Sequence, residues 1–212
     1  MSKKLVPMLG LISASLFAAD AAIAQQAGDL FVRARAIYVM PDESATTSIG
    51  GTVGIDNKVV PEVDFTYFIA DNIGVELIAA TTKHNVVGLG TALGASADLG
   101  SAWLLPPTLS LQYHMPMANN SAIKPYVGAG VNYTFFYSEK EAGGAISDFN
   151  LKDSFGFSLQ AGADFEITDN TFLNVDVKKL FLSTDAEING GAVTADVKIN
   201  PWIFGVGIGR KF

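Results

Sequence analysis

The stretch that decides the fold is NPWIFGVGIGRKF, residues 200–212 at the end of the chain. Side chains of an extended strand alternate between two faces. One face here carries large apolar groups, and the other is mostly glycine. The large groups are Trp202, Phe204, Val206, Ile208 and Phe212. In a soluble protein the second face would normally carry polar groups that meet water, so the segment raises the question of which medium lies on each side.

The composition narrows the class of protein. The chain has 212 residues, of which 49% are hydrophobic and 17% charged, with 21 glycines, 14 phenylalanines and no cysteine. This apolarity indicates either a large core or a surface that faces lipid. Without cysteine there is no disulfide and no thiolate site. The net charge of −7 argues against nucleic acid as a partner.

The first 24 residues differ from the rest. Lys3 and Lys4 precede an apolar run from Leu5 to Ala19, and the segment ends in the small residues Ala22-Ile23-Ala24. This order is typical of a secretory signal peptide, and the run is shorter than the roughly 20 residues of a spanning helix. We therefore predict a cleaved signal peptide at 1–24 and one domain at 25–212, with a retained anchor as the alternative.

After residue 25 the apolar residues alternate and show no helical period. The alternating runs lie at 30–39, 59–69, 73–80, 105–115, 126–135, 155–166, 173–178 and 202–212. Their connections near 70–72, 116–122 and 167–171 are short, whereas those near 40–58, 85–104, 138–153 and 183–195 are long. Short turns at one end and long loops at the other predict an all-β fold, an eight-stranded antiparallel up-and-down barrel.

The charged residues decide between a soluble barrel and a transmembrane one. In the short-turn half they share one face with a few polar groups: Arg33, Arg35, Asp64, Glu76, Gln112, His114, Asp164, Asp176 and Lys178. A basic group facing lipid costs roughly 2–4 kcal/mol near the bilayer midplane. We therefore expect this set to form a polar floor inside a transmembrane β-barrel, with the apolar face in the bilayer. Lys179 is the main exception, which a bulge or snorkelling would accommodate.

The same assignment explains the C-terminal segment. Its aromatic face meets lipid, and its glycines leave room for Arg and Glu side chains inside the barrel. Because parity changes between Ile199 and Trp202, a bulge is expected at Asn200-Pro201. An interfacial aromatic girdle is expected from residues near the strand ends, namely Tyr38, Tyr67, Tyr113 and Phe212.

Towards the long loops the inward positions become apolar, with Glu62 as the exception. The expected lining of a hydrophobic channel is Ile37, Val39, Val60, Ile78, Phe136, Leu180, Trp103 and Leu104. One interpretation is a dry pocket above the closed floor, which an apolar molecule enters from outside and leaves sideways into lipid. The other is a packed core, since interiors of this size are commonly filled by side chains.

Several blocks of the chain resemble the outer-membrane protein W family. They are GDLFVRARAIYVMPDE (28–43), PTLSLQYH (107–114), KPYVGAGVNYTFF (124–136), LNVDVKK (173–179) and the C-terminal segment. The resemblance implies an eight-stranded barrel in a Gram-negative outer membrane, with a narrow channel for small hydrophobic molecules. Arg210 departs from the family ending, which usually shows an aromatic residue there. Terminal Phe212, which the barrel-assembly machinery would read, is present.

The other motifs are weak. GLGTALG (88–94) lacks the spacing and the following helix of a dinucleotide loop. His84 and His114 are expected at opposite ends of adjacent strands, so we expect no shared metal, no cofactor and no enzyme.

Two functions remain. The first is uptake of small hydrophobic solutes, in contact with outer-membrane lipids and with both termini in the periplasm. The second is a structural barrel whose outer loops bind phage, bacteriocins or host surfaces. A soluble secreted binder is disfavoured by the lipid-facing apolar band.

Overall fold

The computed structural model describes residues 25–117 and 121–212, so the predicted signal peptide lies outside it. The strands are β1 (Leu30–Met40), β2 (Ser44–Thr47), β3 (Thr52–Ile55), β4 (Lys58–Ala70), β5 (Ile73–Ala80), β6 (Thr82–Thr91), β7 (Gly94–Leu105), β8 (Thr108–His114), β9 (Ile123–Glu141), β10 (Phe149–Leu151), β11 (Ser154–Thr168), β12 (Thr171–Phe181), β13 (Ser183–Ile188), β14 (Val193–Lys198) and β15 (Trp202–Lys211). Within the described residues, no helix is long and apolar enough to cross a membrane.

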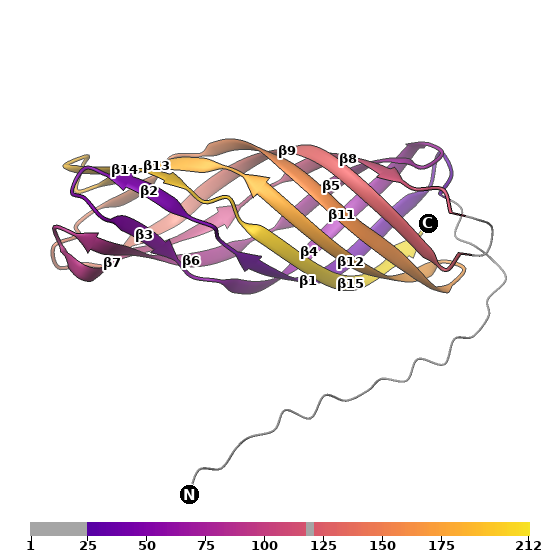
Figure 1. Ribbon diagram of the computed structural model, residues 1–212, viewed down its shortest axis with the longest axis horizontal. Coiled ribbons are helices and arrows are strands. Elements are labelled where there is room, and N and C mark those ends of the chain that lie inside the picture. Colours follow the sequence, from indigo (N-terminus) through magenta and orange to yellow (C-terminus); the bar gives the residue numbers. More distant parts are fainter. Residues whose placement is uncertain (1–24, 118–120) are drawn as a thin grey trace, which may run out of the picture.

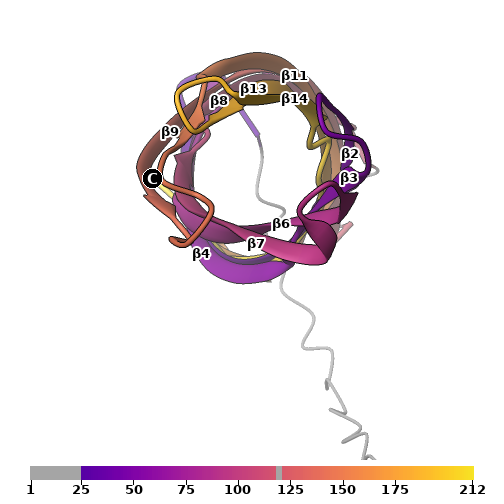
Figure 2. The same cartoon turned by 90° about the vertical axis from the view of Figure 1, so that its left-hand side faces the viewer.

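Eight of these strands close into an antiparallel barrel (Figure 1). Their order around the wall is β1, β4, β5, β8, β9, β11, β12 and β15, and β15 pairs again with β1. Figure 2 looks onto one end of the barrel, where the wall forms a closed ring. The predicted fold class is therefore confirmed.

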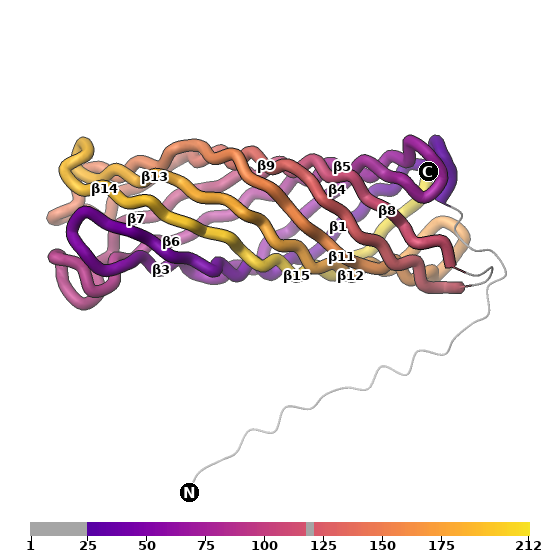
Figure 3. Tube along the Cα trace, turned by 45° about the horizontal axis from the view of Figure 1, so that its top comes forward, coloured from indigo at the N-terminus to yellow at the C-terminus, as the bar shows by residue number. Residues whose placement is uncertain are grey.

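The two ends of the barrel differ. The C-terminus lies at one end, where the backbone N–H of Phe212 donates to the carbonyl of Leu30 and the tight turns at 71–72 and 169–170 reverse the chain. We call this the short-turn end. The opposite, long-loop end carries β2, β3, β6, β7, β13 and β14 (Figure 3). Much of the sequence predicted to be long loops is therefore strand that extends the wall.

One of these extensions shows why the sequence allows a tight hairpin. β13 and β14 are joined by residues 189–192, in which Asn189, Gly190 and Gly191 have φ angles of 53°, 65° and 87°. Glycine adopts positive φ at no steric cost, and asparagine tolerates it better than most residues, so this Asn-Gly-Gly sequence suits the turn. β6 and β7 form a second hairpin, and the strands between β1 and β4 add to the wall singly, since β2 pairs with β14 and β3 pairs with β6.

Apolar and polar side chains alternate along the wall as predicted. Phe155, Leu111 and Val206 point outward and are 61%, 55% and 57% exposed, whereas Arg33 and Asp64 point inward and are fully buried. A soluble barrel would have the reverse distribution. The outer wall is therefore suited to lipid, and the interior holds the charges.

The glycines of β15 let other side chains approach its inner face. A Cβ atom at Gly207 would overlap the Ala34 carbonyl and Arg35, and one at Gly209 would overlap the ring of Phe172. The predicted room for arginine is confirmed. The other occupant is Phe172, not a glutamate.

The predicted bulge at Asn200-Pro201 is absent. The register is the same on both sides of this point, where Lys179 lies opposite Trp202 and Ser183 lies opposite Lys198, so no extra residue is inserted. The strand is interrupted here without a shift. β14 ends at Lys198 and β15 begins at Trp202, and Asn200 has a φ of 37°. Its side-chain oxygen replaces a backbone acceptor, receiving the N–H of Leu182 at 3.0 Å. Ile199 is nevertheless buried inside while Trp202 points outward, so the alternation continues without a change. The parity argument assumed that the side chain of Ile199 faces lipid. It faces the apolar interior instead.

Lys179 lies on the lipid-facing side, as predicted. Its Nζ donates to Asp42 Oδ2 at 2.9 Å and to the carbonyl of Asn200 at 2.6 Å, and it lies 4.8 Å from the centre of the Trp202 ring. The long stem therefore crosses the apolar surface while the ammonium group reaches polar atoms near the long-loop end.

Candidate functional site

The short-turn half of the lumen is crossed by buried ion pairs that start from two arginines of β1. Arg33 Nη1 lies 2.9 Å from Asp64 Oδ1, and Arg33 Nη2 lies 3.0 Å from Asp164 Oδ2. Arg35 Nη2 lies 2.8 Å from Asp64 Oδ2, and Arg35 Nε lies 2.8 Å from Glu62 Oε1. The arginines share a face because they are two residues apart on one strand.

The other floor residues complete this network. Glu76 accepts hydrogen bonds from Arg35 Nη2 at 3.3 Å and from Gln160 Nε2 at 2.7 Å. Lys178 Nζ lies 3.4 Å from Asp176 Oδ1 and 3.5 Å from Glu62 Oε1. All nine residues that we expected in the polar floor are buried inside the barrel: Arg33, Arg35, Asp64, Glu76, Gln112, His114, Asp164, Asp176 and Lys178.

The sequence suggested that Glu62 is an isolated charged residue in the apolar half. In the structure it is not isolated. Its pairs with Arg35 and Lys178 make it the upper layer of the charged network. The ion pair between Lys178 and Glu62 also forms the base of the apolar space above it, because both residues line that space.

The sequence analysis did not predict a layer of aromatic rings that lies between Arg33 and the short-turn end. Phe31, Phe68 and Phe172 are completely buried, and the ring centre of Phe31 lies 4.9 Å from each of the other two. The Arg33 guanidinium carbon lies 5.6 Å and 5.4 Å from the rings of Phe31 and Phe172, within cation–π range. The signal was present, since each phenylalanine has the parity of the charged residues on its own strand.

The short-turn mouth is occupied by His114 and Gln25. His114 Nδ1 lies 2.8 Å from Gln25 Nε2, and His114 Nε2 lies 2.9 Å from Gln112 Oε1. An amide nitrogen donates and an amide oxygen accepts, so these contacts assign the proton of His114 to Nε2. His84 lies in the other half of the barrel, and among the described residues no group of three or more His, Cys, Asp or Glu could hold a metal ion.

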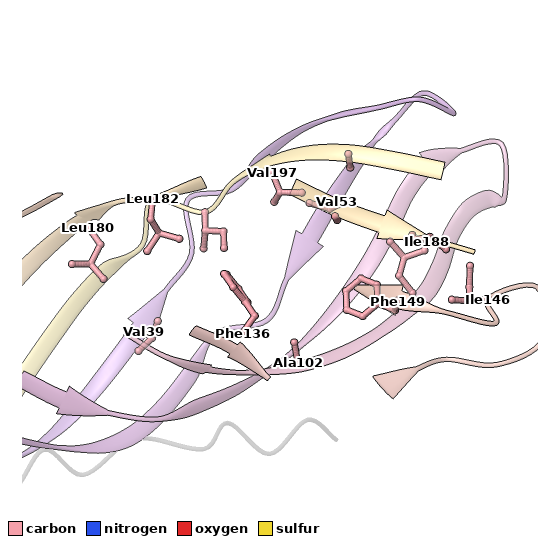
Figure 4. Packing of buried hydrophobic residues seen from close by; sticks show 14 of the residues in the cluster. Val39, Val53, Ala102, Phe136, Ile146, Phe149, Leu180, Leu182, Ile188 and Val197 are labelled. Carbon is pink, nitrogen blue, oxygen red and sulfur yellow. The ribbon is translucent and has the colours of Figure 1, made fainter. Parts of the chain in front are cut away.

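A large apolar pocket occupies the long-loop half of the lumen (Figure 4). Its empty volume is about 1350 Å³, part of which is open to solvent. Seven residues of the expected channel lining face it: Ile37, Val39, Val60, Ile78, Leu104, Phe136 and Leu180. The strands of the long-loop end add residues that the sequence did not place there, including Val53, Phe149, Leu182 and Val197.

Trp103 is a correction to the expected lining. It points outward, is 37% exposed, and stacks on Tyr137 with the ring centres 6.3 Å apart. The expectation treated Trp103 and Leu104 as parts of one loop. Both belong to β7, and neighbouring residues of a strand face opposite sides, so only Leu104 can reach the pocket.

A polar tie at the rim, beyond the membrane-spanning part of the wall, joins the turn between β3 and β4 to β6. His84 Nδ1 lies 2.7 Å from the carbonyl oxygen of Asp56, and the Asp56 carboxylate accepts the N–H of Asn85 at 2.9 Å and its side-chain amide at 2.8 Å. Burial lowers the pKa of His84 below its usual value. Burial alone would raise the pKa of Asp56, but hydrogen bonds from Lys58 and Asn85 lower it overall.

The sequence and the fold can be compared with known proteins. The model of the family described as "OmpW family" matches residues 26–212. "Outer membrane protein W" of Escherichia coli (strain K12) is 38% identical over 201 residues, which cover 90% of this chain and 92% of that protein. "Dibenzothiophene metabolism operon protein DoxH" of Pseudomonas sp. (strain C18) is 32% identical over 168 residues, or 77% of this chain and 76% of that protein. The crystal structure of the outer membrane protein OprG from Pseudomonas aeruginosa has a TM-score of 0.83 and 34% identity, covering 89% of this chain and 98% of that one.

Proposed function

This chain belongs to the OmpW family of outer-membrane proteins, and from that premise we propose that it is a channel for the uptake of small hydrophobic molecules. In this proposal the long-loop end faces the outside of the cell, and both termini face the periplasm. An apolar molecule enters the pocket from outside and leaves sideways into the bilayer. The role requires binding and release but no catalysis.

The observation that carries the proposal is the division of the lumen along its axis. The pocket is lined almost entirely by aliphatic and aromatic carbon, and directly beneath it lie the ion pair of Lys178 with Glu62 and the arginine network. Separating one partner of a buried ion pair costs about 3–5 kcal/mol, and an apolar molecule offers nothing in return. Straight passage through the floor is therefore strongly disfavoured.

The β4 strand supplies a place for sideways release. Its ladder with β5 ends at Glu62 and Ala80, and the next residue of β4 is Pro61, which has no N–H to donate. β4 continues to Lys58 and pairs there with β1. Nearer the long-loop end, hydrogen bonds from Asn85 on β6 to the Asp56 carboxylate hold the segment before β4 against β6. We propose that the solute leaves between Pro61 and Thr81, close to the pocket residues Val60 and Ile78.

The class of solute follows from the lining and from one relative. Polar groups make a small part of the pocket surface, which favours uncharged molecules over carboxylates and amines. DoxH is named for an operon of dibenzothiophene metabolism, and dibenzothiophene is a small uncharged apolar compound. We propose uptake of compounds of this kind, surrounded by outer-membrane lipids. Terminal Phe212, whose side chain is exposed, is the proposed signal to the barrel-assembly machinery.

The absence of cysteine allows a direct test of the exit. A double variant, Pro61→Cys with Thr81→Cys, places a disulfide across the proposed opening, because the register of Glu62 with Ala80 puts the two positions opposite each other. In cells, the oxidised protein should bind an apolar fluorescent probe but lose uptake of radiolabelled dibenzothiophene, and reduction should restore uptake. The control, Val63→Cys with Ala79→Cys, lies within the existing ladder and should leave uptake unchanged in both redox states.

The outcomes separate the parts of the proposal. Equal uptake by the oxidised and reduced forms would disprove exit beside Pro61. No uptake and no probe binding in either form would disprove the transport function, and the loops at the long-loop end would then be tested as a receptor surface.

A further inference from the structure

The lower lumen has two chemically different sides. The arginines and most of the carboxylates come from β1, β4, β5 and β12, whereas β8, β9 and β11 supply mainly uncharged polar groups. We call this second side the neutral wall. It is formed by Thr108, Ser110, Gln112, Gly128, Gly130, Asn132, Ser158 and Gln160.

Four buried polar atoms of the neutral wall have no hydrogen-bond partner among the described residues. They are Ser110 Oγ, Ser158 Oγ, Gln112 Nε2 and Gln160 Oε1. A buried polar atom without a partner destabilises the fold, and four together would offset much of the stability of a small domain. Isolated cases occur in native proteins, but a cluster of four requires a partner that the chain itself does not supply.

These atoms gather around two glycines. In the ladders of β8, β9 and β11, Gly130 lies between Ser110 and Ser158, and Gly128 lies between Gln112 and Gln160. β9 therefore contributes no side chain to either row. A Cβ atom at Gly128 would lie 2.8 Å from Gln160 Nε2, and one at Gly130 would lie 2.5 Å from Ser110 Oγ. The side chains of Gln160 and Ser110 thus lean over the bare backbone of β9, in the space that a Cβ atom would fill. We call the line along Gly128 and Gly130 the seam.

Hydrogen-bonded groups continue the seam in both directions. Towards the pocket, Asn132 Nδ2 donates to Thr108 Oγ1 at 2.9 Å and Asn132 Oδ1 accepts from Thr134 Oγ1 at 2.7 Å, and both threonines line the pocket. Towards the short-turn mouth, Gln112 Oε1 accepts a hydrogen bond from His114 Nε2, and His114 Nδ1 accepts one from Gln25 Nε2. Among the described residues of the neutral wall, the atoms without partners lie beside the two glycines.

We propose that the seam along Gly128 and Gly130 binds a row of ordered water molecules. These waters satisfy the four atoms and connect the pocket to the short-turn mouth by hydrogen bonds alone. The row is uncharged and narrow, and it lies beside the ion pairs without interrupting them. It gives water and protons a route through the floor that apolar molecules cannot use, and so goes beyond the proposed uptake function, on which it does not depend.

Solid-state NMR of the protein in lipid bilayers tests the proposal through water-to-protein magnetisation transfer. The probe is the side-chain amide of Gln112, and the internal control is that of Asn174. Both residues are completely buried, but Asn174 Nδ2 already donates to Asp164 at 2.8 Å and to Tyr126 at 3.1 Å. Rapid transfer to Gln112 with little transfer to Asn174 is expected. Equal transfer to both amides, or none to Gln112, overturns the proposal.

A variant that fills the seam provides a second measurement. Ser110→Val with Ser158→Val replaces both hydroxyls by methyl groups, and transfer to the Gln112 amide should be lost. The control variant Ser183→Val changes an exposed serine and should leave the transfer intact. Undiminished transfer in the double variant would show that water reaches Gln112 by another route and would overturn the proposal. If the double variant does not fold, the comparison of Gln112 with Asn174 in the unmodified protein still decides.

Discussion

Arg33 on β1 and Asp164 on β11 form a two-point ion pair inside the barrel, with Nε to Oδ1 at 3.3 Å and Nη2 to Oδ2 at 3.0 Å. β12 and β15 separate the two strands in the wall. The pair therefore connects parts of the barrel that share no backbone ladder, and both of its side chains are buried.

Replacing Asp164 by alanine should destabilise the barrel by about 3–5 kcal/mol, because Arg33 would remain buried with one of its two main partners missing. Urea unfolding in lipid vesicles measures the difference. Asp196→Ala is the control, since this carboxylate is exposed at the long-loop end and its loss should change stability by less than about 0.5 kcal/mol. Equal effects of the two substitutions would show that the ion pair does not stabilise the fold.

The glycines of β15 should differ in their tolerance of alanine. A Cβ atom at Gly207 meets the fixed backbone of Ala34, whereas one at Gly205 meets flexible side-chain atoms of Ile37 at 3.3 Å and Arg35 at 3.4 Å. Gly207→Ala should cost about 1–3 kcal/mol or prevent folding, and Gly205→Ala should cost clearly less. The same unfolding experiment compares them. A milder effect at Gly207 would contradict the packing described here.

A carboxylate placed in the pocket should weaken the binding of apolar molecules. Leu180→Glu puts the charge among the lining residues, and we expect at least about tenfold weaker binding, or 1.4 kcal/mol, of a fluorescent apolar probe. The neighbouring residue Phe181 points to lipid, so Phe181→Leu should leave the affinity unchanged. Unaltered binding by the Leu180 variant would place the probe elsewhere on the protein.

Acidification should loosen the rim tie between Asp56 and β6. Burial lowers the pKa of His84 in the folded protein, so the folded form favours neutral imidazole, and the detached form takes up a proton first as the pH falls. Stability from this group is complete above the ordinary histidine value of about 6.5 and decreases below it. The hydrogen-exchange protection of the Asn85 amide, corrected for intrinsic rates, should fall between about pH 7.5 and about pH 5. In His84→Gln this decrease should be absent.

Trp103 should report on lipid and not on the pocket. In a Trp202→Phe variant, Trp103 is the one remaining tryptophan. Its fluorescence should be quenched by brominated lipids, because the ring lies on the outer wall beside Tyr137. An apolar ligand without quenching groups should leave its emission nearly unchanged. The opposite pattern would return Trp103 to the pocket lining.

Much of this protein was determined by the sequence itself, because strand side chains repeat every two residues and lipid does not tolerate charge. The two-residue period alone assigns Arg33 and Asp64 to the lumen, and it assigns Phe65 and Val206 to the lipid-facing side. The nine floor residues and seven of the eight expected lining residues face the lumen for this reason. The exception, Trp103, arose where a strand was taken for a loop and the alternation was not applied.

Only the tertiary structure decided which inward residues meet. Arg33 and Asp164 are 131 residues apart, and the stagger of the closed barrel sets their contact. The same stagger places Gly128 and Gly130 between polar partners on two other strands and groups Phe31, Phe68 and Phe172 into one layer. The odd or even position of a residue along its strand determines which side of the wall it faces. Its neighbours across the lumen depend on how all eight strands close.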